Sequence, residues 1–188
     1  MSYKNPLSIS HEIVSKYLGE GDTAVDATAG NGNDTVFLAK IVGCRGKVYS
    51  FDIQNTAIEN TRKKLKINDL LNRVELINEG HQLMDKYVPP GVKVIMFNLG
   101  YLPGGNHQIA TKPKSTISAI NKSLDLLQVG GIIMMVIYYG GDSGFEEKDA
   151  VMKYIEQLNY KKYSVLALNF VNWLNCPPIS VCIEKTSE

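Results

Sequence analysis

One short stretch, residues 25–35, limits the possible folds of this chain more than any other; it reads VDATAGNGNDT. Its first residues are small or β-branched, as in a buried parallel strand. Gly30 and Gly32 then permit a tight turn and let the backbone approach a ligand closely. Asn31 or Asn33 would cap the helix that follows, leaving its first backbone N–H groups directed at that ligand. We therefore predict a strand, a ligand-binding turn and a helix in succession.

A second predicted strand indicates what kind of ligand this turn binds. Residues 48–53 are mainly apolar and include Asp52, about twenty residues after the glycine turn, where related folds place the acid that binds ribose. Gly30 and Gly32 resemble the start of the dinucleotide fingerprint, although Thr35 stands in place of its third glycine. The alternative is a simple two-glycine turn followed by an unrelated, solvated aspartate. We favour a nucleotide-cofactor loop.

Composition narrows the class of protein. The chain has 188 residues, about the length of one domain, so we expect a single domain over residues 1–188 with a leading helix inside residues 1–20. The net charge is only +1, from 20 Lys and Arg against 19 Asp and Glu. Because no basic field extends over the whole chain, any RNA-binding surface must be local.

The cysteines and the first residues of the chain indicate where in the cell the protein is located. Cys44, Cys176 and Cys182 lack the spacing of metal ligands, which indicates a reducing compartment and argues against zinc. Residues 1–6 contain no apolar signal segment, and the longest apolar run, residues 132–139, is too short to span a bilayer. We therefore expect a cytoplasmic protein.

Alternating strands and helices predict an α/β fold. Strands are predicted at residues 24–27, 47–53, 74–77, 92–98, 132–137, 162–170 and 179–184, and helices at 7–18, 33–42, 56–67, 113–127 and 146–158. The last two strands have no helix between them, which indicates an antiparallel hairpin at one edge of a mostly parallel sheet with helices on both faces. A seven-stranded sheet of this kind is typical of S-adenosylmethionine-dependent methyltransferases. A NAD-dependent oxidoreductase would need a further αβ half.

Several motifs carry a resemblance to one family in particular. They are the turn at residues 26–34, FDIQ at 51–54, FNLGYLPGG at 97–105, TKP at 111–113 and NCPP at 175–178. Together they resemble the small rRNA-methylase family of class I S-adenosylmethionine-dependent methyltransferases, over roughly residues 7–185. The chain departs from the family pattern at residues 139–142, where Tyr-Gly-Gly-Asp replaces a turn that contains histidine. That turn is therefore given no role.

The resemblance implies a reaction and a partner. The family includes a tRNA methyltransferase that N-methylates 5-aminomethyl-2-thiouridine at wobble position 34 to the 5-methylaminomethyl form. The implied cofactor is S-adenosylmethionine, which becomes S-adenosylhomocysteine, with no metal ion. The implied partner is the anticodon stem-loop of tRNA. Because a small RNA-binding enzyme gains surface by pairing with a second copy, we also expect a homodimer.

The predicted cofactor-binding residues follow the strand ends and the family pattern. Asp52 is expected to bind the ribose hydroxyls, and Gln54 the ribose edge or the adenine. Asp26 would hold the methionine group together with the glycine turn, and His81 would lie at the adenine rim unless it is a packing histidine. His11, on the leading helix, and His107 have weaker cases. The full predicted set is Asp26, Thr28, Gly30, Asn31, Asn33, Asp34, Asp52, Gln54, Gly80 and His81.

The predicted fourth strand ends in the residues expected to meet the substrate. Residues 98–101, Asn-Leu-Gly-Tyr, resemble the Asn-Pro-Pro-Tyr motif of amino-group methyltransferases, in which Asn accepts the amine N–H and Tyr stacks on the base. Such acceptors direct the amine lone pair at the methyl carbon. We predict Asn98 and Tyr101 as catalytic, unless Asn98 only caps a turn. The predicted substrate-binding residues are Leu99, Gly100, Gly104, Gly105, Lys112, Lys114, Asn172, Asn175 and Pro177, the lysines contacting RNA phosphates.

Two other functions stay open. The same chemistry could act on another RNA, such as rRNA, or on a small-molecule amine, because enzymes of this fold change substrates through their loops. A non-catalytic RNA-binding or cofactor-sensing module would keep the pocket without turnover. Asn98 and Tyr101 argue against that class of protein.

Overall fold

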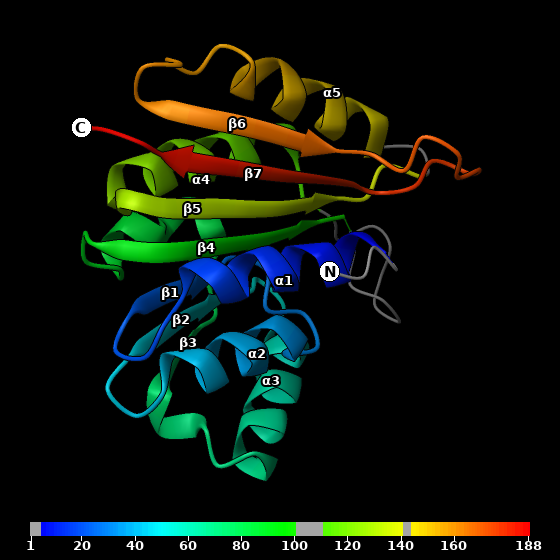
Figure 1. Cartoon of the computed structure of the whole chain (residues 1–188). Helices are drawn as coiled ribbons and strands as arrows, with labels where there is room; N and C mark the ends of the chain where they lie inside the picture. Colours follow the sequence, from blue (N-terminus) through cyan, green and yellow to red (C-terminus); the bar gives the residue numbers. More distant parts are fainter. Residues whose placement is uncertain (1–4, 101–110, 141–143) are drawn as a thin grey trace.

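The computed structural model describes residues 5–100, 111–140 and 144–188, and within them seven strands form one sheet. The strand order across the sheet is β3-β2-β1-β4-β5-β7-β6 (Figure 1). The strands are β1 (Thr23–Asp26), β2 (Lys47–Phe51), β3 (Val74–Ile77), β4 (Val92–Leu99), β5 (Leu127–Ile137), β6 (Tyr163–Leu168) and β7 (Ile179–Lys185). The helices are α1 (Pro6–Tyr17), α2 (Asn33–Val42), α3 (Asn55–Ile67), α4 (Pro113–Leu126) and α5 (Gly144–Ile155), with short 3-10 helices η1 (Leu71–Arg73) and η2 (His81–Lys86).

The strand directions confirm the predicted class I methyltransferase sheet. Strands β1 to β5 pair in parallel, while β7 runs antiparallel to both β5 and β6. Strand β6 is thus the outer member of the predicted terminal hairpin. Because parallel strands end at the same edge, the residues that follow β1, β2, β3 and β4 all gather at one end of the sheet.

Alternating side chains along the strands build a core on each face of the sheet. In β4, Ile95 and Phe97 pack in the cluster that includes Ala119 of α4 and Val151 of α5. Their neighbours Val94 and Met96 point to the other face and pack in the cluster that includes Leu38 and Val14. Helices α1, α2 and α3 therefore cover one face and α4 and α5 the other, as the two layers in Figure 1 show. Since both faces are covered, the central strands are apolar throughout.

Two predictions about local structure were wrong. Neither Asn31 nor Asn33 caps α2: the N-cap is Gly32, with a φ of 76° and no side-chain cap. Glycine is required there, because a Cβ atom would lie 2.8 Å from the backbone of Thr61 on α3. Strand β5 begins at Leu127 rather than at residue 132, since an irregularity in its pairing with β4 accommodates the two glycines at 130 and 131.

The leading helix has a well-defined start. Asn5 and Ser8 form a reciprocal capping box, and Pro6 occupies the first turn, where its missing N–H costs nothing. Helix α1 packs against β5 and β7 and reaches β4. None of the described helices has the combination of length and hydropathy that a membrane span requires.

Candidate active site

A cavity of about 770 Å³ opens at the carboxyl end of the parallel strands. The loops after β1, β2, β3, β4 and β5 line it, together with the start of α4, Leu7 of α1, and Cys176 and Pro178 before β7. This is the end of the sheet at which open α/β folds bind their ligands. The predicted site and the cavity therefore coincide.

Most of the predicted site residues line this cavity. They include the predicted catalytic residue Asn98. Of the cofactor set these are Thr28, Gly30, Asn31, Asn33, Asp34, Asp52, Gln54, Gly80 and His81, and of the substrate set Leu99, Gly100 and Lys112. Asp26, Lys114, Asn172, Asn175 and Pro177 are not among the lining residues. Tyr101, Gly104, Gly105 and His107 lie outside the residues that the structure describes.

Asp52 follows β2 and is held by backbone groups from two loops. Its Oδ2 accepts a hydrogen bond of 2.9 Å from the Gly30 N–H, and its Oδ1 accepts one of 2.9 Å from the Gln54 N–H. Partial burial raises the pKa of this carboxyl, and the backbone donors oppose that rise. A carboxylate has about four lone-pair directions, so each oxygen keeps room for a further donor such as a ribose hydroxyl.

Asp26 is close to the cavity but does not line it. Its side chain is fully buried, accepting hydrogen bonds from the Thr28 N–H at 3.1 Å and from the Thr35 hydroxyl at 2.5 Å. The Thr35 hydroxyl also lies 2.9 Å from that of Ser50 on β2. Burial, followed by the charge of Asp34, raises the pKa of Asp26 to about 7. In this arrangement Asp26 holds the glycine turn from beneath. Its direct contact with a methionine group stays a prediction.

His81 packs against the core and also lines the cavity. It is 8% exposed, and its ring meets that of Phe97 edge-on with centroids 5.8 Å apart. Its Nδ1 lies 3.1 Å from the Ala27 carbonyl oxygen. Because a carbonyl only accepts, Nδ1 must carry the proton. Burial lowers the pKa of His81, so the neutral ring leaves Nε2 as a hydrogen-bond acceptor.

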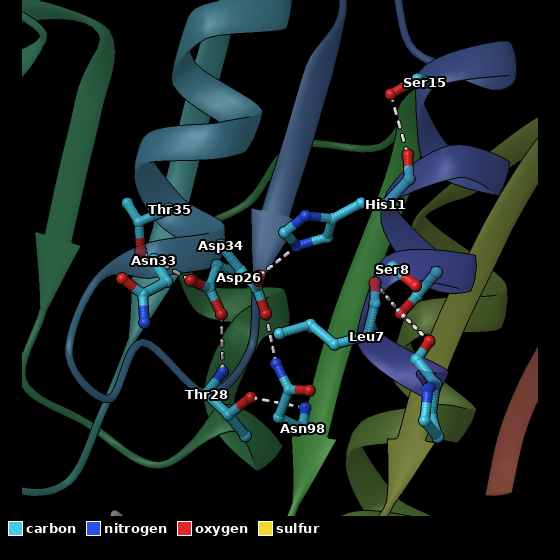
Figure 2. A network of polar contacts seen from close by, with 12 residues as sticks. Leu7, Ser8, His11, Ser15, Asp26, Thr28, Asn33, Asp34, Thr35 and Asn98 are labelled. Carbon is cyan, nitrogen blue, oxygen red and sulfur yellow. Dashed lines mark hydrogen bonds and ion pairs between the residues drawn. The ribbon is translucent and has the colours of Figure 1, made fainter. Parts of the chain in front are cut away.

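Asn98, near the end of β4, belongs to a polar chain that links three elements (Figure 2). Its backbone N–H donates to the Thr28 hydroxyl at 2.7 Å, and its side-chain Nδ2 donates to Oδ2 of Asp34. The other oxygen of Asp34, Oδ1, lies 2.6 Å from Nε2 of His11 on α1. The His11 ring stacks on Phe37 of α2, with centroids 3.9 Å apart and an interplanar angle of 6°.

The side-chain oxygen of Asn98 differs from its nitrogen in having no hydrogen-bond partner among the described residues. This atom, Oδ1, is buried. A buried acceptor without a partner costs roughly 1–3 kcal/mol, so native proteins rarely keep one unless it serves a ligand or water. Because Asn98 lines the cavity, a ligand with a hydrogen-bond donor is a candidate partner for this oxygen.

The residues on either side of 101–110 are anchored to one another. The Gly100 N–H donates to the Thr111 hydroxyl at 2.9 Å, and the Thr111 N–H donates to the Gly100 carbonyl at 3.0 Å. The Thr111 hydroxyl in turn donates to the buried Glu147 at 2.5 Å. Gly100 has a φ of 147°, and a Cβ atom would lie 3.2 Å from Tyr138. Thr111, and through it Gly100, is thus tied to Glu147 of α5.

Sequence reasoning missed the contribution of the leading helix. Leu7 lines the cavity and His11 contacts Asp34, although no spacing in the sequence connects α1 to the glycine turn. Tyr138 and Tyr139, after β5, also line the cavity; burial raises the pKa of Tyr138. Among the described residues, no group of three or more His, Cys, Asp and Glu side chains is arranged to hold a metal ion.

Known proteins share this fold and much of this sequence. The model of the family described as "Putative rRNA methylase" matches residues 48–184. A tRNA (mnm5s2U34)-methyltransferase, chloroplastic, from Arabidopsis thaliana is 40% identical over 79% of this chain, which spans only 58% of the length of that relative.

Solved structures extend the match to nearly the whole chain. The "putative rRNA-methylase" from Clostridium thermocellum is 55% identical, with a TM-score of 0.97 over 98% of this chain and 100% of that one. A "putative methyltransferase" from Streptococcus mutans, in complex with SAH, is 40% identical, with a TM-score of 0.90 over 98% of this chain and 99% of the other. This chain therefore belongs to the Putative rRNA methylase family and has its class I methyltransferase fold.

Proposed function

We propose that this protein is an S-adenosylmethionine-dependent tRNA methyltransferase. Its substrate is the amino nitrogen of 5-aminomethyl-(2-thio)uridine at wobble position 34, and its product is the 5-methylaminomethyl form. The observation that carries the proposal is the buried Oδ1 of Asn98, unpartnered among the described residues; Asn98 lines the same cavity as Asp52. An acceptor suits a neutral amine, which brings N–H donors to the site.

The cavity residues fit S-adenosylmethionine. Asp52 has lone pairs left for two ribose hydroxyls, and the glycine turn with the start of α2 presents backbone N–H groups suited to the methionine carboxylate. Ile53 and His81 supply flat and apolar surface for the adenine. When bound, this cofactor supplies the electrophilic methyl group. The SAH complex of the Streptococcus mutans relative supports this choice of ligand.

Asn98 is the residue that orients the nucleophile. Its Oδ1 accepts one N–H of the amine, which fixes the direction of the nitrogen lone pair for in-line attack on a methyl carbon. Positive charge develops on the nitrogen during transfer, and a carbonyl dipole held in place beforehand stabilises that charge. The product ammonium then loses its proton to solvent, so no strong base is needed.

Groups near the cavity suit RNA. Lys112 is exposed, lines the cavity and occupies the N-cap of α4 without a side-chain cap. Between β6 and β7, the rings of Phe170 and Trp173 stack with centroids 4.1 Å apart. Trp173 also lines a pocket of about 350 Å³ that shares Leu7, Tyr138 and Pro178 with the main cavity. Cationic and aromatic groups around one binding surface are typical of single-stranded nucleic-acid contacts.

The choice of tRNA rests on the Arabidopsis relative, which is named for this reaction at 40% identity. Another RNA or a small-molecule amine is the nearest alternative substrate, because the same acceptor would serve any amine. A non-catalytic cofactor sensor would have no use for the open acceptor of Asn98. The cytoplasmic location and the homodimer stay predictions.

The test is methyl transfer in vitro. The purified protein is incubated with S-adenosylmethionine and tRNA from a strain in which its gene is deleted, and the nucleosides are then analysed by mass spectrometry. We expect the 5-aminomethyl nucleoside to gain one methyl group on its amine. The proposal is wrong if tRNA stays unchanged while the protein binds S-adenosylmethionine in calorimetry, and it is wrong about the cofactor if NAD binds instead.

A further inference from the structure

We infer that His11 and Asp34 form a positioning pair that holds the Asn98 amide in the single orientation that presents its oxygen to the amine. This inference rests on the proposed function of Asn98. It assigns Asp34, which was expected to bind cofactor, and His11, on the leading helix, to the substrate side of the site.

The orientation of the Asn98 amide follows from Asp34. A carboxylate only accepts hydrogen bonds, so the amide must turn its NH2 group toward Asp34, as the contact from Nδ2 to Oδ2 requires. Its oxygen then points to the opposite side, where it has no partner among the described residues. Rotation of the amide by 180° would present N–H donors to a substrate that also brings donors, and the acceptor would be lost.

His11 holds Asp34 in turn. Asp34 is only 5% exposed, and its two oxygens are divided between His11 and Asn98, at 2.6 Å for the contact to His11. Because the carboxylate accepts, Nε2 of His11 carries the proton in this contact. Stacking on Phe37 fixes the plane of the ring. Asp34 also lies in the first turn of α2, where the helix dipole favours a negative charge.

The pair therefore acts through Asn98 rather than on the reacting atoms. Without the His11 N–H, one buried oxygen of Asp34 would have no donor among the residues that the structure describes, and the carboxylate could rotate toward another partner. The Asn98 amide would then populate both orientations. Figure 2 shows this arrangement, with His11 reaching from α1 across to the start of α2.

Matched variants distinguish the contribution of the His11 N–H donor from that of the stacked His11 ring. His11→Phe keeps a ring that can stack on Phe37 but loses the donor. His11→Gln loses the ring but can place a side-chain N–H near the position of Nε2. Asp34→Asn lets the Asn98 amide pair in either orientation. Ser15→Ala is the control, since Ser15 lies on the same helix and donates only to the His11 carbonyl.

The first measurement needs no substrate. Selective 15N labelling of asparagine gives the side-chain amide signals of Asn98, which are assigned by their loss in Asn98→Ala. We expect these signals to move or broaden in His11→Phe and Asp34→Asn and to stay near their wild-type positions in His11→Gln and Ser15→Ala. Unchanged Asn98 signals in His11→Phe would overturn the inference, whatever the protein methylates.

The second measurement is the rate of methyl transfer to tRNA. We expect kcat to fall about ten-fold in His11→Phe and in Asp34→Asn, the size of one lost charge-assisted hydrogen bond, and less than about three-fold in His11→Gln. The dissociation constant for S-adenosylmethionine should stay within two-fold in the His11 variants. Equal kcat in His11→Phe and the wild type would also overturn the inference. If the wild type transfers no methyl group, the proposed function fails instead, and the amide signals alone decide the orientation.

Discussion

The two sides of the cavity satisfy their polar groups in different ways. At the ends of β1 and β2, Asp52 and Asp26 already receive hydrogen bonds from backbone N–H groups and a hydroxyl. Near the end of β4, Asn98 keeps a buried oxygen open. The proposed cofactor side is thus organised before any ligand arrives, whereas the proposed substrate side retains an acceptor that has no partner among the described residues. Catalysis favours this division, because a prearranged dipole costs no reorganisation during the reaction.

The two sides of the cavity also differ in how far apart their hydrogen-bond partners lie in the sequence. Thr28 and Asp26 are separated by 2 residues, and Gly30 and Asp52 by 22, within one βαβ unit. Asp34 and Asn98 are separated by 64 residues, and the His11 contact adds a third element. The groups around Asp52 and Asp26 therefore come from one local unit of the chain, whereas those around Asn98 come from the three separate elements α1, α2 and β4.

Among these predictions, removal of the Asn98 side chain should have the largest effect on activity. We expect Asn98→Ala to lower kcat by about a hundred-fold, comparable to the loss of one prearranged group in other active sites. Cofactor affinity should stay nearly intact, because the partner of Asn98 is the amine. Single-turnover methylation and calorimetry measure the two quantities, with Asn68→Ala on the exposed end of α3 as a matched control. Wild-type single-turnover rates in Asn98→Ala would remove this residue from the chemistry.

Removing the Asp52 carboxylate should weaken cofactor binding rather than slow methyl transfer. We expect Asp52→Ala to weaken S-adenosylmethionine binding about ten-fold or more, as one charged acceptor contributes roughly 1.5–3 kcal/mol. Asp52→Asn keeps one acceptor oxygen and should fall between Asp52→Ala and the wild type. Calorimetry checks the affinities and circular dichroism the fold. A wild-type dissociation constant in Asp52→Ala would contradict the ribose-binding role.

The buried carboxyl of Asp26 should make stability depend on pH. Burial raises its pKa from 3.8 to about 7, so the folded protein binds a proton that the unfolded chain releases. The free energy of unfolding should therefore decrease as pH rises through the window between these values, by about 1 kcal/mol from pH 6 to pH 7.5.

Asp26→Asn isolates this contribution. The asparagine can accept from the Thr28 N–H and donate to the Thr35 hydroxyl, like the protonated acid. Urea unfolding at several pH values should show the stability of Asp26→Asn rising relative to the wild type as pH increases. Parallel pH profiles for the two proteins would show that Asp26 does not titrate in this range.

The smallest effect should come from the lysines next to the cavity. Lys112 and Lys114 are exposed at the start of α4, where positive charge is unfavourable unless an anion offsets it. If they meet phosphate, the Lys112→Ala/Lys114→Ala double mutant should reduce the slope of log affinity against log salt by about one per lysine. The exposed pair Lys63→Ala/Lys66→Ala on α3 removes the same charge elsewhere. Equal slopes for both double mutants would place the RNA on another surface.

Features that depend on short stretches of sequence could be predicted. The strand, glycine turn and helix at residues 23–42, Asp52 after β2 and the helix-free final strands are local patterns, and they led to the family and the fold that the structure and the comparisons confirm. Local patterns failed at the start of α2, because the close approach of Thr61 makes glycine necessary at residue 32 and leaves the neighbouring asparagines without a capping role.

Only the tertiary structure decided which side chains meet. Asp26 and Asp34 both flank the same turn in the sequence, yet one is buried beneath it and the other joins His11 to Asn98. Asn172, Asn175 and Pro177 lie outside the cavity lining, while their neighbours Cys176 and Pro178 belong to it. The physical reason is that strand and turn propensities act over a few residues, whereas these contacts depend on how α1, α2 and β4 pack. The chain therefore specifies its glycine turn locally, and brings Asn98, Asp34 and His11 together only once the whole sheet has formed.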